Sequence, residues 1–129
     1  MEWLFDNNAP IYSQLIDRIK LGIVSGELPP GARLPSVRDM ATEAGVNPNT
    51  MQRALQELER EALVFSQRTS GRYVTEDENV INAEKKAFAD AQVAHFLDSM
   101  SGLGFTPQEI LALLESKVKE ASEDGGIGM

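Results

Sequence analysis

One helical face of the sequence carries side chains that can form hydrogen bonds to nucleic-acid bases. Residues three or four positions apart share a side of a helix, and this face holds Asn49, Gln52, Arg53, Gln56 and Arg60. Amide and guanidinium groups can pair with the base edges exposed in the major groove of DNA. The spacing predicts a helix that reads double-stranded DNA, with a solvated surface as the ordinary alternative. For Arg60, which has acidic neighbours, a surface ion pair is the favoured interpretation.

The opposite face of the same segment is apolar. Its buried residues recur at i, i+3, i+4 and i+7, as a helix packed on a core requires; they are Met51, Ala54, Leu55 and Leu58. Asn47 is placed to cap the helix, and Pro48 suits its first position, where the missing N–H is not needed. The segment is therefore predicted to form an amphipathic recognition helix.

A shorter helix is predicted directly before it. Ser36 is spaced from Asp39 to form a capping box, and Gly45 ends the helix where a left-handed residue is needed. Its inward positions are Met40, Ala41 and Ala44. Two short helices with a tight turn between them are typical of a helix-turn-helix.

The flanking elements complete a winged helix-turn-helix. Pro10 opens a helix predicted to run to about Ser25. Residues 63–67 and 72–75 have strand character, with the turn 68–71 between them. Arg68 and Arg72 at the tip of this hairpin suit contact with a phosphate backbone or a minor groove.

The C-terminal part is predicted to form two further helices. One runs from Val80 to about Met100; the other begins at Pro107, with Thr106 and Glu109 forming a capping box. Residues 77–129 are too few to bury a good core alone, so we expect a second copy to cover their apolar stripes. The expected interface residues are Phe88, Ala91, Leu97, Ile110, Leu111 and Leu114. The last residues, 123–129, are expected to be disordered.

The fold class predicted is thus mainly α with a small β-hairpin. It comprises a winged helix-turn-helix DNA-binding domain, residues 1–76, and a short helical dimerisation or effector domain, residues 77–129.

The charge distribution is compatible with a DNA partner. The 129-residue chain carries a net charge of −8, which alone argues against binding to phosphates. Residues 1–76 account for −2 and residues 77–129 for −6, whereas the stretch from Arg33 to Arg72 has a charge of +1 and only arginine as its basic residue. We expect the acidic C-terminal part to point away from DNA.

Other classes of protein find little support in the sequence. There is no cysteine, and no phosphate-binding glycine loop or nucleophile motif marks an enzyme. The single histidine, His95, does not make a metal site, so no metal or cofactor is expected. No signal peptide or membrane span is visible, and a cytoplasmic location follows. Trp3 and Phe5 are expected to cover a seam rather than to stack on a ligand.

Residues 10–64 resemble the N-terminal domain of the GntR family of bacterial repressors. The runs NPNTMQRALQELERE and GFTPQEILALL, together with a C-terminus of only two helices, resemble the YtrA-like branch of that family. The resemblance implies a homodimeric repressor of a bacterial operon, often one that encodes an ABC transporter.

The resemblance also assigns roles to individual residues. Arg38, in the PSVRD motif, matches an arginine at the DNA backbone and groove edge. The full set of candidate DNA-binding residues is Ser36, Arg38, Asn47, Asn49, Thr50, Gln52, Arg53, Arg68, Ser70, Gly71 and Arg72. Two departures stand out: Ala62 replaces a usual glycine before the wing, and Thr69-Ser70 replaces a common glycine and basic residue within it.

Two alternatives remain open at this point. One is a winged-helix module that binds proteins and has abandoned DNA, for which the net charge is the support. The other is a metabolite-sensing regulator whose effector site lies between subunits. The operator, the effector and the regulated genes are not encoded in any pattern of the sequence.

Overall fold

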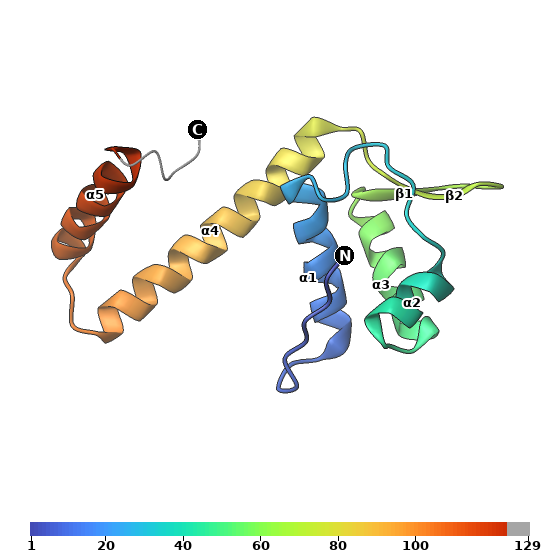
Figure 1. Cartoon of the computed structure of the whole chain (residues 1–129), viewed down its shortest axis with the longest axis horizontal. Helices are drawn as coiled ribbons and strands as arrows, with labels where there is room; N and C mark the ends of the chain where they lie inside the picture. The colour runs from blue at the N-terminus through green and yellow to red at the C-terminus, as the bar shows by residue number, and fades with distance from the viewer. Residues whose placement is uncertain (124–129) are drawn as a thin grey trace. The chain divides into compact units, whose positions relative to one another are not determined.

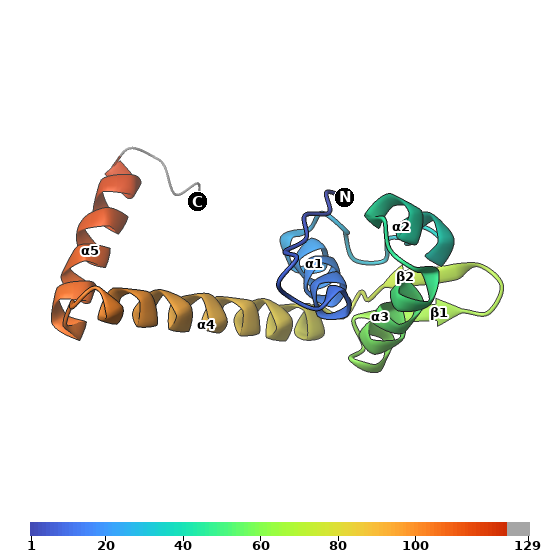
Figure 2. The ribbon, with the colours of Figure 1, turned by 90° about the horizontal axis from the view of Figure 1, so that it is seen from below.

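The computed structural model describes residues 1–123, which form five helices and one two-stranded sheet (Figures 1 and 2). The elements are α1 (Ile11–Ser25), α2 (Val37–Ala44), α3 (Pro48–Arg60), β1 (Val64–Gln67), β2 (Gly71–Val74), α4 (Glu78–Gly102) and α5 (Pro107–Glu123). The predicted fold class is confirmed. The predicted disorder of the tail concerns residues that, apart from Glu123, lie outside the described part.

The chain divides into two compact units, residues 1–86 and 87–129. The first unit contains the winged helix-turn-helix and the first turns of α4. Val80 and Ile81 pack against its core. Nζ of Lys20 in α1 forms ion pairs with Oε1 of Glu61 at 2.8 Å and with Oε1 of Glu84 at 3.1 Å. The start of α4 is thus fixed to the N-terminal unit, which ends at residue 86, ten residues beyond the boundary predicted from composition.

The core of the first unit lies between α1, α2, α3 and the hairpin. α1 contributes Leu15, Ile19 and Ile23, which repeat every four residues and are fully or almost fully buried. Gly26 ends this helix with a φ of 86°, a left-handed conformation that glycine adopts without strain. The regular apolar spacing therefore produces the packed face that the sequence indicates.

The predicted caps of the helix-turn-helix are present. The Ser36 side chain accepts a hydrogen bond from the Asp39 amide, and the Asn47 side chain accepts one from the Asn49 amide. Gly45 adopts a φ of 72° between the two helices. The apolar face of α3 is buried as predicted, through Met51, Ala54, Leu55 and Leu58. Local capping and apolar spacing thus determine this motif.

The wing is an antiparallel hairpin in which Val64 pairs with Val74 and Gln67 with Gly71. Each strand is shifted by about one residue from its predicted start. β1 begins at Val64 because the Leu63 amide still closes the end of α3, with a 3.0 Å bond to the Leu58 carbonyl. A third short segment joins the sheet, since Arg33 forms a bridge with Tyr73.

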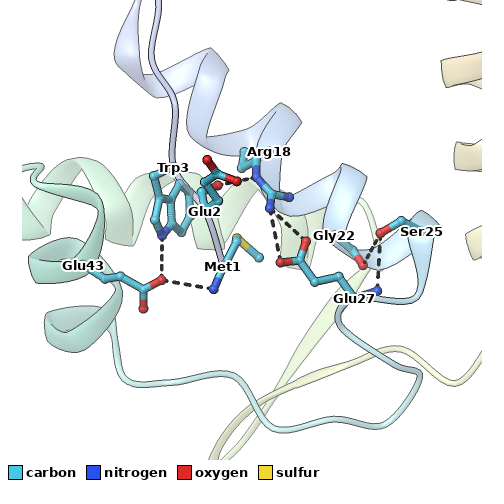
Figure 3. A network of polar contacts seen from close by, with 8 residues as sticks. All are labelled: Met1, Glu2, Trp3, Arg18, Gly22, Ser25, Glu27 and Glu43. Carbon is cyan, nitrogen blue, oxygen red and sulfur yellow. Dashed lines mark hydrogen bonds and ion pairs between the residues drawn. The ribbon is translucent and has the colours of Figure 1, made fainter.

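An N-terminal segment fastens α2 to α1 (Figure 3). The Trp3 indole donates a 3.1 Å hydrogen bond to Glu43, near the end of α2. The Arg18 guanidinium donates to the Glu2 carbonyl and forms an ion pair with Glu27. The Trp3 ring stacks on Phe5 with centroids 6.1 Å apart, and both rings pack against the core. These contacts cover the seam between α1 and α2.

The described part of the second unit has little interior of its own. Ile110 is the only buried residue within 87–123. At the start of α5, Thr106 and Glu109 exchange both hydrogen bonds of the predicted capping box; the backbone and side-chain bonds to Thr106 hold the pKa of Glu109 below its ordinary value. No helix within residues 1–123 has both the length and the apolar composition needed to span a bilayer.

Candidate nucleic-acid interface

The polar face of α3 points to solvent while its apolar face fills the core. Asn49, Arg53 and Gln56 are exposed, and Gln52 is half-buried. The side-chain oxygen of the cap residue Asn47 accepts a hydrogen bond from the backbone amide of Asn49. The NH₂ group of the Asn47 side chain is therefore left available to donate. The face therefore presents hydrogen-bonding groups at the N-terminal end of the helix, the part that contacts base edges in helix-turn-helix proteins.

Arg53 is held over an aromatic ring of the neighbouring helix. Its guanidinium carbon lies 4.7 Å from the centroid of the Tyr12 ring in α1. A cation over an aromatic face is attracted by the ring quadrupole, which is worth about 0.5–1 kcal/mol at an exposed site. Arg53 is thus partly pre-oriented on the surface, a restraint that the polar spacing of α3 did not indicate.

Arg72 does not project from the wing tip, where the sequence placed it. It lies within β2, and its side chain reaches back to α3, where Nε donates to Glu59 and Nη1 donates to the Gln52 side-chain oxygen at 3.3 Å. Its side chain is 18% exposed. Arg72 therefore joins the wing to the recognition helix. The turn that contains Arg68 is the part of the wing left to contact a phosphate backbone.

Glu59 accepts the hydrogen bond that holds Arg72 against α3. Partial burial opposes its charged form, but hydrogen bonds from Ser66 and Arg72 and the Arg72 charge together lower the pKa of Glu59. Its carboxylate accepts from both side chains. Glu59 is thus a structural link between α3 and the hairpin.

Arg33 lies beside the wing, a placement that sequence spacing left open. A Cβ built on Gly71 would come within 3.3 Å of the Arg33 Nε, and Gly71 itself has a φ of 114°. Gly71 therefore permits both the left-handed turn and the close approach of Arg33. Ser70, half-buried, donates to the Gln67 side chain within the turn.

The six arginines between residues 33 and 72 fall into two groups. Arg53, Arg60 and Arg72 are engaged by Tyr12, by Glu57 and by Glu59 respectively. In the described part of the chain, the other three are exposed and form no ion pair; they are Arg33, Arg38 and Arg68. The ion pair of Arg60 agrees with its sequence interpretation. The second group has the guanidinium groups available for phosphate.

The remaining candidates lie at the start of α2 and in α3. Arg38 is exposed at the second position of α2, and Ser36 precedes it as the cap. Thr50 is half-buried. Within the described residues, no group of three or more His, Cys, Asp or Glu side chains could hold a metal ion; His95 is exposed on α4.

The expected interface residues of the C-terminal helices differ in exposure. Leu97, Leu111 and Leu114 are 42%, 58% and 40% exposed, whereas Ile110 is only 3% exposed. Phe88 is half-buried and Ala91 is exposed. Ile110 is thus already covered by its own chain, while the three leucines present an apolar surface to solvent.

Residues 11–74 match the family model for bacterial regulatory proteins of the gntR family. The uncharacterised HTH-type transcriptional regulator YhcF of Bacillus subtilis is 38% identical over 111 residues, which span 86% of this chain and 92% of that protein. The HTH-type transcriptional repressor YtrA of the same organism is 40% identical over 80 residues, 62% of each chain.

Solved structures give the same result. A GntR family transcriptional regulator from Listeria monocytogenes has a TM-score of 0.78 and 38% identity, covering 87% of this chain and 98% of that one. The DNA-binding domain of AraR, solved in complex with its operator ORX1, has a TM-score of 0.53 and 25% identity; the match covers 58% of this chain and 96% of that domain.

Proposed function

The chain belongs to the GntR family of bacterial regulatory proteins, and from that premise we propose that it is a homodimeric repressor of a bacterial operon. It is a DNA-binding transcriptional regulator with an N-terminal winged helix-turn-helix. We further propose which residues contact DNA, that the protein forms a dimer, and that its operator is a palindrome. The observation that carries the proposal is the exposed polar face of α3 in a unit that also exposes three arginines without an ion pair in residues 1–123.

We assign base reading to α3. Asn49 and Gln52 lie at its N-terminal end with amide groups that can pair with base edges, and Arg53 lies beside them. Asn47 and Thr50 are assigned to DNA contact at the same end of α3. These side chains discriminate between sequences, because hydrogen bonds to base edges are specific whereas contacts to phosphate are not.

Backbone contacts are assigned to the three arginines that have no acidic partner in residues 1–123. Arg38 flanks α3 from α2, Arg68 lies in the wing turn, and Arg33 lies against Gly71. Ser36 adds a hydroxyl group near Arg38 at the start of α2, and Ser70 adds one near Arg68 in the wing turn. Since each neutralised phosphate releases counterions, these residues supply affinity that depends on salt.

Dimerisation through α4 and α5 is supported by the exposed apolar side chains of the second unit. Val93 and Leu97 on α4, and Leu111, Leu114 and Val118 on α5, are between 40% and 58% exposed. Large apolar surfaces of this kind mark interaction sites. A twofold dimer places two recognition helices in successive major grooves, so the operator is a palindrome with half-sites about 10 bp apart.

The proposed class of regulated genes follows from the family resemblance, whereas the proposed place of an effector follows from the small size of the C-terminal part. A transporter operon is the proposed target, and the protein acts in the cytoplasm without a cofactor. The effector site is proposed to lie between subunits. A winged module that only binds proteins is less well supported, because it does not account for unpaired arginines around a polar helix face.

The experiment is a selection of binding sequences from a random duplex library, together with sedimentation of the protein. We expect a dimer, and we expect the enriched sequences to be inverted repeats with half-site centres about 10 bp apart. A monomer, or enriched sequences without twofold symmetry, would contradict the proposed assembly.

A further inference from the structure

A chain of hydrogen bonds runs from the recognition helix to the wing and back. Glu59 accepts from Arg72 Nε, and Arg72 Nη1 donates to the side-chain oxygen of Gln52 at 3.3 Å. Glu59 and Gln52 lie on the same helix, seven residues apart, which is two helical turns. Arg72 therefore lies alongside α3 and touches one residue that has been assigned to base reading.

The chemistry of this contact fixes the orientation of the Gln52 amide. A guanidinium has five N–H donors and no acceptor, so only the oxygen of the amide can face it. The NH₂ end of Gln52 is consequently the end left free. One of the two lone pairs of the amide oxygen is then occupied, so Gln52 presents chiefly its NH₂ donors to a partner, whereas a free glutamine presents a donor and a fully available acceptor side by side.

The two states of glutamine read different bases. Adenine offers N7 as an acceptor and N6 as a donor, which a free glutamine matches with both of its groups. Guanine offers two acceptors, O6 and N7, and cytosine offers the N4 donor. Gln52 with its oxygen engaged donates to both acceptors of guanine or to the single O4 acceptor of thymine, retains only one lone pair for the N6 donor of adenine, and meets cytosine with a donor facing a donor.

We propose that Arg72 acts as a positioning residue that makes Gln52 read guanine through its NH₂ donors. The inference rests on the proposed function in one respect, namely that Gln52 contacts a base edge. The wing then influences sequence selection without touching a base itself. Glu59 completes the arrangement, because its carboxylate holds the guanidinium along α3.

The geometry around Glu59 supports a fixed rather than a mobile Arg72. Glu59 also accepts from Ser66 on β1, so one carboxylate joins α3 to side chains of both strands. The side chains of Arg72 and Glu59 are 18% and 29% exposed. Arg72 is thus more enclosed than a typical surface arginine, and a charge-assisted pair of this kind is stronger than a neutral one.

The test compares base preferences selected from a random duplex library by the wild-type chain and four variants. Gln52→Ala identifies the base pair that Gln52 reads, because preference is lost there alone. Arg72→Met then frees the Gln52 oxygen. Arg68→Met is the matched control, since it removes a wing arginine that has no contact with α3.

We expect guanine in the wild type at the position identified by Gln52→Ala. Arg72→Met should reduce the preference for guanine over adenine there by about fivefold or more, the effect of one bidentate pair, and leave other positions unchanged. Arg68→Met should weaken binding with the same preferences. The double variant Glu59→Gln/Arg72→Met, which leaves no unpaired carboxylate, should behave as Arg72→Met does.

Three results would overturn the inference: adenine as the wild-type preference at that position, an unchanged preference in both Arg72 variants, or an equal loss of selectivity at every position. The last would mean that Arg72 only supports the fold. A wild type that selects no sequence at all would instead refute the proposed function, so the two failures are distinct.

Discussion

The amide of Leu63 donates a 3.0 Å hydrogen bond to the carbonyl of Leu58, and the chain makes this turn with Ala62 in a left-handed conformation. Ala62 has a φ of 64° and is the only residue other than glycine with a positive φ in the described part of the chain. The bond from Ala62 to the Glu59 carbonyl completes a Schellman motif. The glycine usual in the family at this position thus has a physical reason.

We predict that Ala62→Gly stabilises the protein. A Cβ in the left-handed region costs about 1–2 kcal/mol, of which the extra freedom of glycine in the unfolded chain offsets a part. The free energy of unfolding should therefore rise by about 1 kcal/mol. Urea unfolding followed by circular dichroism measures this as a higher midpoint with an unchanged slope.

The control for that variant is the same substitution at an ordinary helical site. Ala83 is exposed within α4, and Ala83→Gly should lower the free energy of unfolding by about 0.5–1 kcal/mol. If both variants are destabilised to the same extent, Ala62 is not strained in the way that its φ indicates.

The difference between paired arginines and arginines without an ion pair in residues 1–123 predicts that DNA affinity responds differently to salt in their variants. Arg33→Ala, Arg38→Ala and Arg68→Ala should each weaken binding to selected and random duplexes alike, and should reduce the slope of log affinity against log salt by about 1. Arg60→Ala removes an arginine that is paired with Glu57. It should leave both quantities nearly unchanged. Fluorescence titrations at two salt concentrations measure the effects, and equal slopes for all four variants would contradict this distinction.

The Glu59 contacts predict a pH dependence of stability. Because the folded state lowers the pKa of Glu59, its contribution is present above the ordinary value of 4.5 and is lost as the pH falls through the folded pKa. Glu59→Gln should therefore lower the free energy of unfolding at pH 7 by about 1 kcal/mol, a low value for bonds to a charged group because the site is partly exposed.

In acid the difference between wild type and Glu59→Gln should shrink. Urea unfolding at pH 7 and pH 3 measures it, and comparison of the two proteins cancels the titration of the other carboxylates. Glu59→Asp shortens the side chain while keeping its charge, and it serves as a control for charge without reach. A difference that is the same at both pH values would show that the ionised carboxylate contributes nothing.

The exposed leucines of α5 predict a monomeric variant. Leu111→Asp/Leu114→Asp places two carboxylates on the apolar face, where an interface would have to desolvate them. Sedimentation should then show a monomer with retained helical circular dichroism, and affinity for a palindromic site should fall because only one half-site is held at a time.

Ala112→Asp/Ser116→Asp is the matched control for that prediction, since it adds the same charge to α5 outside the apolar stripe. It should remain dimeric. A Leu111→Asp/Leu114→Asp variant that is still a dimer would place the interface elsewhere, and a monomer with full affinity would separate dimerisation from DNA binding.

Local signals in the sequence predicted the winged fold almost completely. Ser36, Asn47 and Thr106 cap the helices that follow them, because capping depends on a few adjacent residues. The buried face of α3 follows from its spacing in the same way. The strand bounds differed by a residue because the end of α3 extends into Ala62 and Leu63.

Contacts between distant segments could not be predicted. The spacing of Arg53 and Tyr12, or of Arg72 and Gln52, shows no periodicity, since these pairs meet only after α1, α3 and the hairpin have packed. A sequence pattern identifies which arginines lie near the interface. Apart from Arg60, whose acidic neighbours indicated its ion pair, it does not indicate which of them other side chains already engage, and this distinction decides their roles.

The measurement that tests the central claim most directly is the ratio of affinities for a selected operator and a random duplex of equal length. It is taken for the wild type, Asn49→Ala and Gln52→Ala at one salt concentration. The account predicts a wild-type ratio of about 10³ or more, and a reduced ratio in both variants while affinity for the random duplex stays unchanged. Ratios equal to that of the wild type would contradict the assignment of α3 as the helix that reads DNA.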